Sequence, residues 1–297
     1  MKKFILSSSV LVCLLFASCE NEGVEVLPAE TESSATESTV GAKGPWSYIL
    51  WEPFDSGSNI TNKWTKTNRK DYNSETTCTY KPSQVGLASL DGKQCLRLTA
   101  KSDGNGKYIS GHIKSKKNFK PAKNQEIYVT ARIKLVAKNG NTWKGFNQTY
   151  GAWPAFWTVN ETDWPKKGEL DIMEGYSYGG SSHFASNLFY GTSVGKNLLS
   201  NTDKSYSISE GWHTYQMRWI NKNNVYSAEM WIDGKKKATY NDANTNKLKM
   251  SNFGWHNVIL NLNVGSDDKN LFQDSKINLF SNTYMYVDYV AVKKRTI

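Results

Sequence analysis

The stretch Glu169-Leu-Asp-Ile-Met-Glu174 places three carboxylates within six residues of a predicted β-strand. Side chains alternate between the two faces of a strand, so Glu169 and Asp171 share one face, and Glu174 should point to the other. One additional residue in a β-bulge, near Ile172 or Met173, would return Glu174 to the face of its partners. We therefore predict a bulged strand with all three acids on one face.

The predicted bulge also sets the separation of the outer two acids. Glu169 and Glu174 would be effectively four strand positions apart, about 13 Å between Cα atoms. Two Glu side chains that lean toward each other can bring their carboxyl groups to about 5–5.5 Å, the separation that a retaining glycosidase needs. The alternative is that the acids only solvate the wet face of an antiparallel sheet. The aromatic stretch at 151–157 and the mutual repulsion of three acids favour catalysis.

Other segments of the chain also read as strands. Apolar residues alternate with polar ones at 127–135 and 285–291, and the stretch 258–264 is apolar on one face with asparagines on the reverse. The segment 226–232 precedes Asp233-Gly234, a typical hairpin turn. No stretch has the pattern of a capped amphipathic helix. The sequence predicts an all-β, two-sheet sandwich.

These motifs resemble glycoside hydrolase family 16, whose hallmark strand reads Glu-x-Asp-x-x-Glu in its bulged version. The resemblance includes the aromatic strand Trp153-Pro-Ala-Phe-Trp157, and it covers roughly residues 46–297. The opening Tyr48-Ile-Leu-Trp-Glu-Pro-Phe-Asp55 and the closing Met285-Tyr-Val-Asp-Tyr-Val-Ala-Val292 are also similar to the family's first and last strands. The resemblance implies a curved β-sandwich jelly roll with a concave substrate cleft.

The three acids are then the expected catalytic residues. We expect Glu169 to attack the anomeric carbon, and Glu174 to protonate the departing oxygen and later activate water. Asp171 lies between them and is suited to orient the nucleophile. No cofactor is required for this chemistry.

Strand alternation also assigns the aromatic strand to the cleft. If Trp157 points into the cleft, then Trp153 and Ala155 do so too, while Pro154 and Phe156 enter the core. The family places the Trp157 position beside the scissile bond, and aromatic rings suit the apolar faces of sugars. A position in the core is the alternative for either tryptophan.

Five further residues are expected to bind substrate with less support from the sequence. The strand of Asn187 and Phe189 resembles the one that pairs with the catalytic strand. His112 and Lys114 have the cleft-facing parity of a strand on which relatives carry an arginine that contacts sugar. Those two side chains could instead be ordinary surface residues. Trp164 could form a rim of the cleft or anchor a loop.

The sequence contains no zinc signature, because its four histidines are scattered and have no i, i+4 pair. The resemblance allows one structural calcium between the first and last strands, with Asp288 as the acidic ligand. Cys78 and Cys95 remain after the predicted leader, and either a disulfide or two buried thiols fits their positions.

Residues 1–18 are expected to be a lipoprotein signal peptide. Lys2 and Lys3 precede an apolar run that is too short to span a membrane, and small residues come before Cys19. Phe16-Ala-Ser-Cys19 resembles a bacterial lipobox, and a standard cleaved signal is the alternative. Residues 19–45, rich in Glu, Ser and Thr, read as a flexible tether. We expect a catalytic domain at 46–297, lipid-anchored to the outer membrane through Cys19 and exposed at the cell surface.

The charge of the chain limits its partners. Three of the 37 basic and six of the 27 acidic residues lie in 1–45, so the remainder has a net charge of +13. Such a charge attracts polyanions, but an exported protein without a nucleic-acid motif is not expected to bind nucleic acid. We expect a monomer whose partner is a polysaccharide and whose only membrane contact is the lipid anchor.

The substrate remains open at this stage. The aromatic strand and the bulged acids most resemble endo-acting enzymes that cut β-1,3- or mixed-linkage β-glucan. A sulfated algal galactan or a mucin O-glycan is the alternative substrate, and a transglycosylase or a non-catalytic surface glycan-binding protein is the alternative function.

Overall fold

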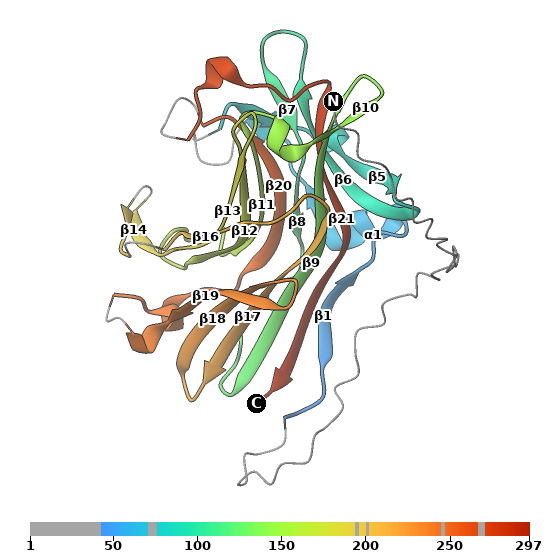
Figure 1. Cartoon of the computed structure of the whole chain (residues 1–297). Helices are drawn as coiled ribbons and strands as arrows, with labels where there is room; N and C mark the ends of the chain where they lie inside the picture. Colours follow the sequence, from blue (N-terminus) through green and yellow to red (C-terminus); the bar gives the residue numbers. More distant parts are fainter. Residues whose placement is uncertain (1–42, 71–75, 194–195, 200–201, 245–246, 267–270) are drawn as a thin grey trace, which may run out of the picture. The chain divides into compact units, whose positions relative to one another are not determined.

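The computed structural model describes residues 43–70, 76–193, 196–199, 202–244, 247–266 and 271–297. The predicted signal peptide, Cys19 and all but the last three residues of the predicted tether lie outside these residues. Within the described part of the chain, no helix has the length and apolar character to cross a membrane. Two large β-sheets dominate this part (Figure 1).

The larger sheet has 12 strands, with the order β19-β18-β17-β9-β21-β6-β7-β4-β3. Strand β1 pairs with β21, β10 with β9 and β5 with β6, and all pairings are antiparallel except that of β4 with β7. Its strands are β1 (Ser47–Glu52), β3 (Arg69–Lys70), β4 (Cys78–Tyr80), β5 (Val85–Leu90), β6 (Lys93–Ser102), β7 (Tyr108–Ser110), β9 (Gln125–Asn139), β10 (Thr142–Gly145), β17 (Trp212–Lys222), β18 (Val225–Ile232), β19 (Lys235–Asn241) and β21 (Asn282–Thr296).

The smaller sheet has seven antiparallel strands, with the order β16-β13-β12-β11-β20-β8-β2. They are β2 (Trp64–Lys66), β8 (His112–Ser115), β11 (Ala152–Val159), β12 (Glu169–Ser177), β13 (Ser182–Phe189), β16 (Lys204–Tyr206) and β20 (Asn257–Val264). A small hairpin pairs β14 (Gly191–Ser193) with β15 (Lys196–Asn197). The helices are short: α1 (Gly57–Lys63) and the 3-10 turns η1 (Pro82–Gln84), η2 (Phe146–Gln148), η3 (Asp242–Asn244), η4 (Met250–Asn252) and η5 (Asp274–Lys276).

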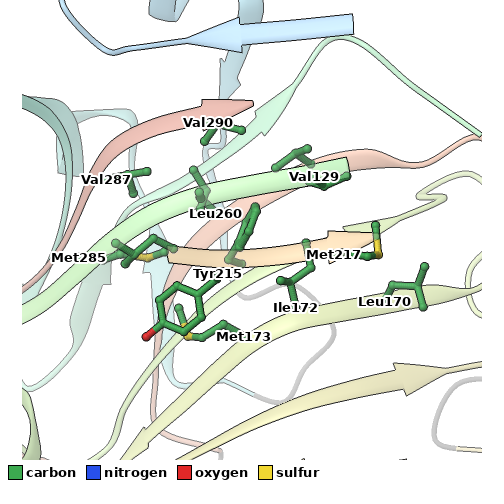
Figure 2. Packing of buried hydrophobic residues seen from close by; sticks show 14 of the residues in the cluster. Val129, Leu170, Ile172, Met173, Tyr215, Met217, Leu260, Met285, Val287 and Val290 are labelled. Atoms are coloured by element: carbon green, nitrogen blue, oxygen red, sulfur yellow. The ribbon is translucent and has the colours of Figure 1, made fainter. Parts of the chain in front are cut away.

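The hydrophobic core lies between the two sheets (Figure 2). Leu170, Ile172 and Met173 of β12 and Leu260 of β20 are fully buried there. Fully burying one such side chain contributes about 1.5–3 kcal/mol. The larger sheet supplies the opposing side chains, which are Val129, Tyr215, Met217, Met285, Val287 and Val290. Because the inner face of the smaller sheet is filled in this way, its other face is left for polar residues.

The strands predicted from alternation are present. Residues 127–135 lie in β9, 226–232 form most of β18, 258–264 lie in β20 and 285–291 lie in β21. Asp233 and Gly234 both have positive φ, at 48° and 71°, as the predicted tight hairpin requires. The prediction of an all-β sandwich is confirmed.

Cys78 and Cys95 are both buried, and no disulfide joins them. Cys78 belongs to the main core, whereas Cys95 packs with Tyr284 and Tyr286 in a separate cluster. Burial raises the pKa of the Cys95 thiol to about 11. Of the two alternatives for this pair, the structure has the buried thiols.

Candidate active site

A β-bulge lies in β12 at the position that the acid spacing predicts. In the pairing of β11 with β12, Phe156 lies opposite Met173, whereas the next residue of β11, Trp157, lies opposite Asp171. Ile172 is therefore the additional residue on β12. The pairing of β12 with β13 shifts its register over the same stretch, between Asp171 and Glu174.

The bulge sends two consecutive side chains into the core and returns the next one to the opposite face. Ile172 and Met173 are both fully buried in the core, and Glu174 rejoins the face of Glu169 and Asp171. All three acids line one open cavity of about 680 Å³. The predicted sharing of one face by the three acids is confirmed.

Strand β11 forms the next part of the cavity wall. Trp153, Ala155 and Trp157 line the cavity, while Phe156 is fully buried in the core. The two indoles have different partners. Trp153 Nε1 donates a hydrogen bond to Glu174 Oε1 at 3.1 Å, and Trp157 Nε1 donates to the side-chain oxygen of Asn261 at 2.6 Å. The faces predicted for this strand are confirmed.

Asp171 is 6% exposed, and its environment disfavours the ionised carboxylate. Burial raises its pKa well above the usual value, and the charges of Glu169 and Glu174 raise it further. The carboxyl group of Asp171 therefore holds a proton at a higher pH than an exposed aspartate does. In the protonated form it can donate a hydrogen bond to a neighbouring carboxylate.

Glu174 is similarly buried, at 8% exposure, and burial raises its pKa. Hydrogen bonds from Tyr176, Trp153 and Asn187 act in the opposite direction because they stabilise the ionised form. The site thus holds a carboxyl group that is protonated at higher pH than usual but has donors ready for its charged form. A group that alternates between acid and base needs both properties.

Two other expected residues support the site from β13. Asn187 lies opposite Asp171 in the strand pairing, and its side chain forms the hydrogen bond with Glu174. Phe189 lies opposite Glu169 and packs against Trp164, with ring centroids 5.3 Å apart. Trp164 lines the cavity, whereas Phe189 contributes to its wall by supporting Trp164.

Lys114 and His112 have different surroundings despite their shared parity. Lys114 lines the cavity, and its Nζ forms an ion pair with Glu161 at 2.8 Å. His112 pairs with Asn261 and so has the predicted face, but it is fully buried against Tyr80. Burial lowers its pKa to about 3, so the ring is neutral at physiological pH.

The expectation that His112 contacts substrate is therefore corrected. Alternation along one strand predicts the face of a side chain, but it cannot predict that a residue from a distant segment covers it. Here Tyr80 of β4 packs on the imidazole, and the hydroxyl of Thr67 lies 2.7 Å from Nδ1.

The cavity also contains residues that the sequence analysis did not assign to it. They are Arg69, Tyr80, Val159, Glu161, Asn261 and Asn263. Asn261 and Asn263 carried a usable signal, since they alternate with the apolar residues of 258–264. Their side chains are joined by a hydrogen bond of 2.9 Å, which continues the one from Trp157 across the strands. Arg69 and Tyr80 come from the larger sheet, and no local pattern places them here.

Asp288 does not fit the role of a calcium ligand. Its Oδ2 accepts a hydrogen bond from Arg132 at 2.8 Å and lies 3.4 Å from Lys93 Nζ. Calcium binds several oxygen ligands, and here two cations already occupy the carboxylate. Among the described residues, no cluster of three His, Cys, Asp or Glu is suited to a metal.

Comparisons with known proteins agree with this geometry. The family model described as "XgeA-like, catalytic GH16 domain" matches residues 144–247, a span that includes the three acids. A protein of Schizosaccharomyces pombe described as "Probable glycosidase" is 22% identical over 176 residues, which are 53% of this chain and 40% of that protein. The chain thus matches less than half the length of this curated relative.

Solved structures share the fold over most of the chain. An endo-1,3-beta-glucanase from Streptomyces sioyaensis has a TM-score of 0.64 and 24% identity, covering 88% of this chain and 99% of that one. A Bacteroides ovatus GH16 protein of a mixed-linkage glucan locus, solved with a G4G4G3G product, has a TM-score of 0.59 and 25% identity, covering 82% and 99%. The laminarinase catalytic domain of Thermotoga maritima has a TM-score of 0.61 and 20% identity, covering 84% and 98%. Residues 144–247 thus match the catalytic domain of glycoside hydrolase family 16, and the described part of the chain shares its fold with these glucanase structures.

Proposed function

We propose that the chain is an endo-acting, retaining β-glycoside hydrolase that degrades β-1,3- or mixed-linkage β-glucan. The observation that carries this proposal is the bulge at Ile172, which brings Glu169, Asp171 and Glu174 to one cavity. Sheet decoration does not account for these acids, because two of them are more than nine-tenths buried, beside aromatic side chains.

Each acid has a distinct role in the proposed reaction. Glu169 attacks the anomeric carbon and forms a covalent glycosyl-enzyme intermediate, while Glu174 protonates the departing glycosidic oxygen. Glu174 then takes a proton from the water that attacks the intermediate, which releases the sugar and restores Glu169. The raised pKa of Glu174 supports its first role, since a general acid must begin protonated. Protonated Asp171 orients Glu169 through a hydrogen bond.

A neutral glucan suits the cavity better than a sulfated polymer. The similar solved structures include enzymes described as endo-1,3-beta-glucanase and laminarinase. Trp153 and Trp157 offer aromatic surface to the apolar faces of glucose rings. Lys114, whose charge would favour a sulfate group, is already ion-paired with Glu161. This ion pair therefore weakens the argument that the substrate is a sulfated galactan.

A substrate panel tests the proposal. The chain is incubated with laminarin, lichenan, agarose, porphyran, carrageenan and mucin, and the products are sized by chromatography. We expect a ladder of oligosaccharides from laminarin or lichenan, and no products from either Glu169→Gln or Glu174→Gln, with both variants folded. Cleavage of agarose, porphyran, carrageenan or mucin alone would support the galactan alternative. Binding without cleavage would indicate a glycan-binding protein.

We further propose that the protein is a monomer tethered to the outer membrane by a lipid on Cys19, with the domain at the cell surface. The basis is the sequence pattern of residues 1–19, with its basic start, apolar run and Cys19. Labelling with radioactive palmitate in a bacterial host should mark the parent chain and leave Cys19→Ala unlabelled. Label on both the parent and Cys19→Ala, or on neither of them, would contradict the proposed lipid on Cys19.

A further inference from the structure

Trp255 is an exposed aromatic residue on the same face of the smaller sheet as the cavity. Its side chain is 62% exposed, and it lies two residues before β20 begins at Asn257. The intervening His256 is fully buried and packs against Trp219 and Phe253 in the core. The backbone remains extended there, since His256 forms an isolated antiparallel bridge with Phe119. Alternation therefore directs Trp255 away from the core.

The neighbours of Trp255 locate it at the rim of the cavity. Asn257, with the same parity, donates a hydrogen bond to Glu161, which lines the cavity. Asn257 also lies opposite Val159, another lining residue. Two residues of an extended strand span about 7 Å, so Trp255 lies about 7 Å along the strand from Asn257 and from the Val159 that faces Asn257.

The backbone around Trp255 is held in place although its indole is in water. The side chain of Asn160 donates a hydrogen bond to the carbonyl of Trp255 at 3.1 Å. On one side, the backbone amide of Gly254 donates a hydrogen bond to the carbonyl oxygen of Lys167 at 2.9 Å. On the other side, the backbone amide of His256 donates to the carbonyl oxygen of Phe119, also at 2.9 Å. Single exposed apolar side chains are ordinary on protein surfaces. Trp255 differs from such ordinary surface residues because its backbone is held by these hydrogen bonds and because it lies at the rim of the cavity that contains the acids.

We propose that Trp255 is a stacking platform for a sugar unit of the polymer that lies outside the cavity. This inference rests on the proposed function and adds a residue that sets the preference for chain length. Aromatic rings bind the apolar faces of sugars at little entropic cost, and a fixed backbone reduces that cost further. A contact remote from the acids helps only those substrates that are long enough to reach it. The platform therefore favours polymers over short oligosaccharides.

The test compares Trp255→Ala with Trp143→Ala over a series of oligosaccharides of increasing length, prepared from whichever polymer the parent cleaves. Trp143 is a matched control because it is also exposed, at 48%, but belongs to β10 of the larger sheet, where it packs against Tyr284 instead of preceding a strand that lines the cavity. For Trp255→Ala we expect kcat/KM to fall about fivefold to tenfold on long substrates, the size of an aromatic contact, and to stay within about twofold on the shortest. Trp255→Tyr should recover most of the loss, and Trp143→Ala should match the parent throughout.

Two results would overturn the platform. One is no loss on long substrates, and the other is an equal loss on short and long ones, which would mean an effect on the fold or on the cavity. Failure of the proposed function is seen separately, as a parent that cleaves no polymer in the panel. In that case, the parent and Trp255→Ala are run as full chains in native gels that contain each polysaccharide, and the retardation of the two proteins is compared. Weaker retardation of Trp255→Ala supports the platform, and equal retardation overturns it.

Discussion

Replacement of Trp153 by phenylalanine should change the pH dependence of catalysis in a defined direction. The indole N–H of Trp153 donates to Glu174 Oε1 at 3.1 Å, and this bond stabilises the ionised carboxylate against the effect of burial. Phenylalanine keeps an aromatic ring but has no donor, so the pKa of Glu174 should rise further. Glu174 must be protonated to act as the acid, so the alkaline limb of the kcat/KM profile should move to higher pH.

The size of this shift follows from the strength of the bond. A hydrogen bond to a charged group contributes about 1.5–3 kcal/mol, and about 1.4 kcal/mol corresponds to one pH unit. Because Trp153 is partly exposed, water replaces part of the lost hydrogen bond, and the lower end of this energy range applies. We therefore expect the alkaline limb to move up by about one pH unit.

The assay is the pH profile of kcat/KM for the parent, Trp153→Phe and Trp157→Phe on a natural oligosaccharide. Trp157 is the matched control, since it lies on the same strand and face but donates to Asn261 instead of Glu174. Its variant should lose activity through weaker sugar binding while its alkaline limb stays in place. An unmoved limb in Trp153→Phe, or equal movement in both variants, would refute the reasoning.

Three further predictions concern stability, and each is measured by urea unfolding. Burial and nearby carboxylates raise the folded-state pKa of Asp171, so the parent keeps its full stability below the unfolded-state pKa of about 4 and loses stability as the pH rises from there through the raised folded-state pKa. Asp171→Asn should exceed the parent by about 1 kcal/mol near pH 7 and match it near pH 3, and a gap independent of pH would contradict this. Leu260→Ala should cost about 2–5 kcal/mol, because Leu260 is fully buried between the sheets, and a cost below about 1 kcal/mol would exclude the packing in Figure 2. Lys114→Met or Glu161→Gln should cost at most about 1 kcal/mol, because both side chains of this ion pair are partly exposed, and a larger loss would mean a stronger coupling.

The sequence was most informative where a short-range rule applies. The spacing of Glu169, Asp171 and Glu174 violates the two-residue period of a strand, and a bulge is the simplest way to bring them to one face. The faces of Trp153 and Trp157 follow from the same period. These predictions needed only the residues of one or two neighbouring strands.

The sequence was least informative where distant segments meet. His112 has the predicted face, but Tyr80 reaches it from another sheet, and its burial could not be read from β8 alone. Asp288 was placed by analogy with relatives, whereas its surroundings depend on Arg132 and Lys93 from two other strands. Chain-distant contacts of this kind have no periodic signal.

The most direct test of the central claim is the anomeric form of the first product. The claim is that the bulge at Ile172 brings Glu169 and Glu174 close enough for a double displacement. Proton NMR of a fresh digest of a β-glucan oligosaccharide, recorded before mutarotation, distinguishes the two anomers at the new reducing end. The account predicts that the β-anomer appears first, and initial release of the α-anomer would contradict it.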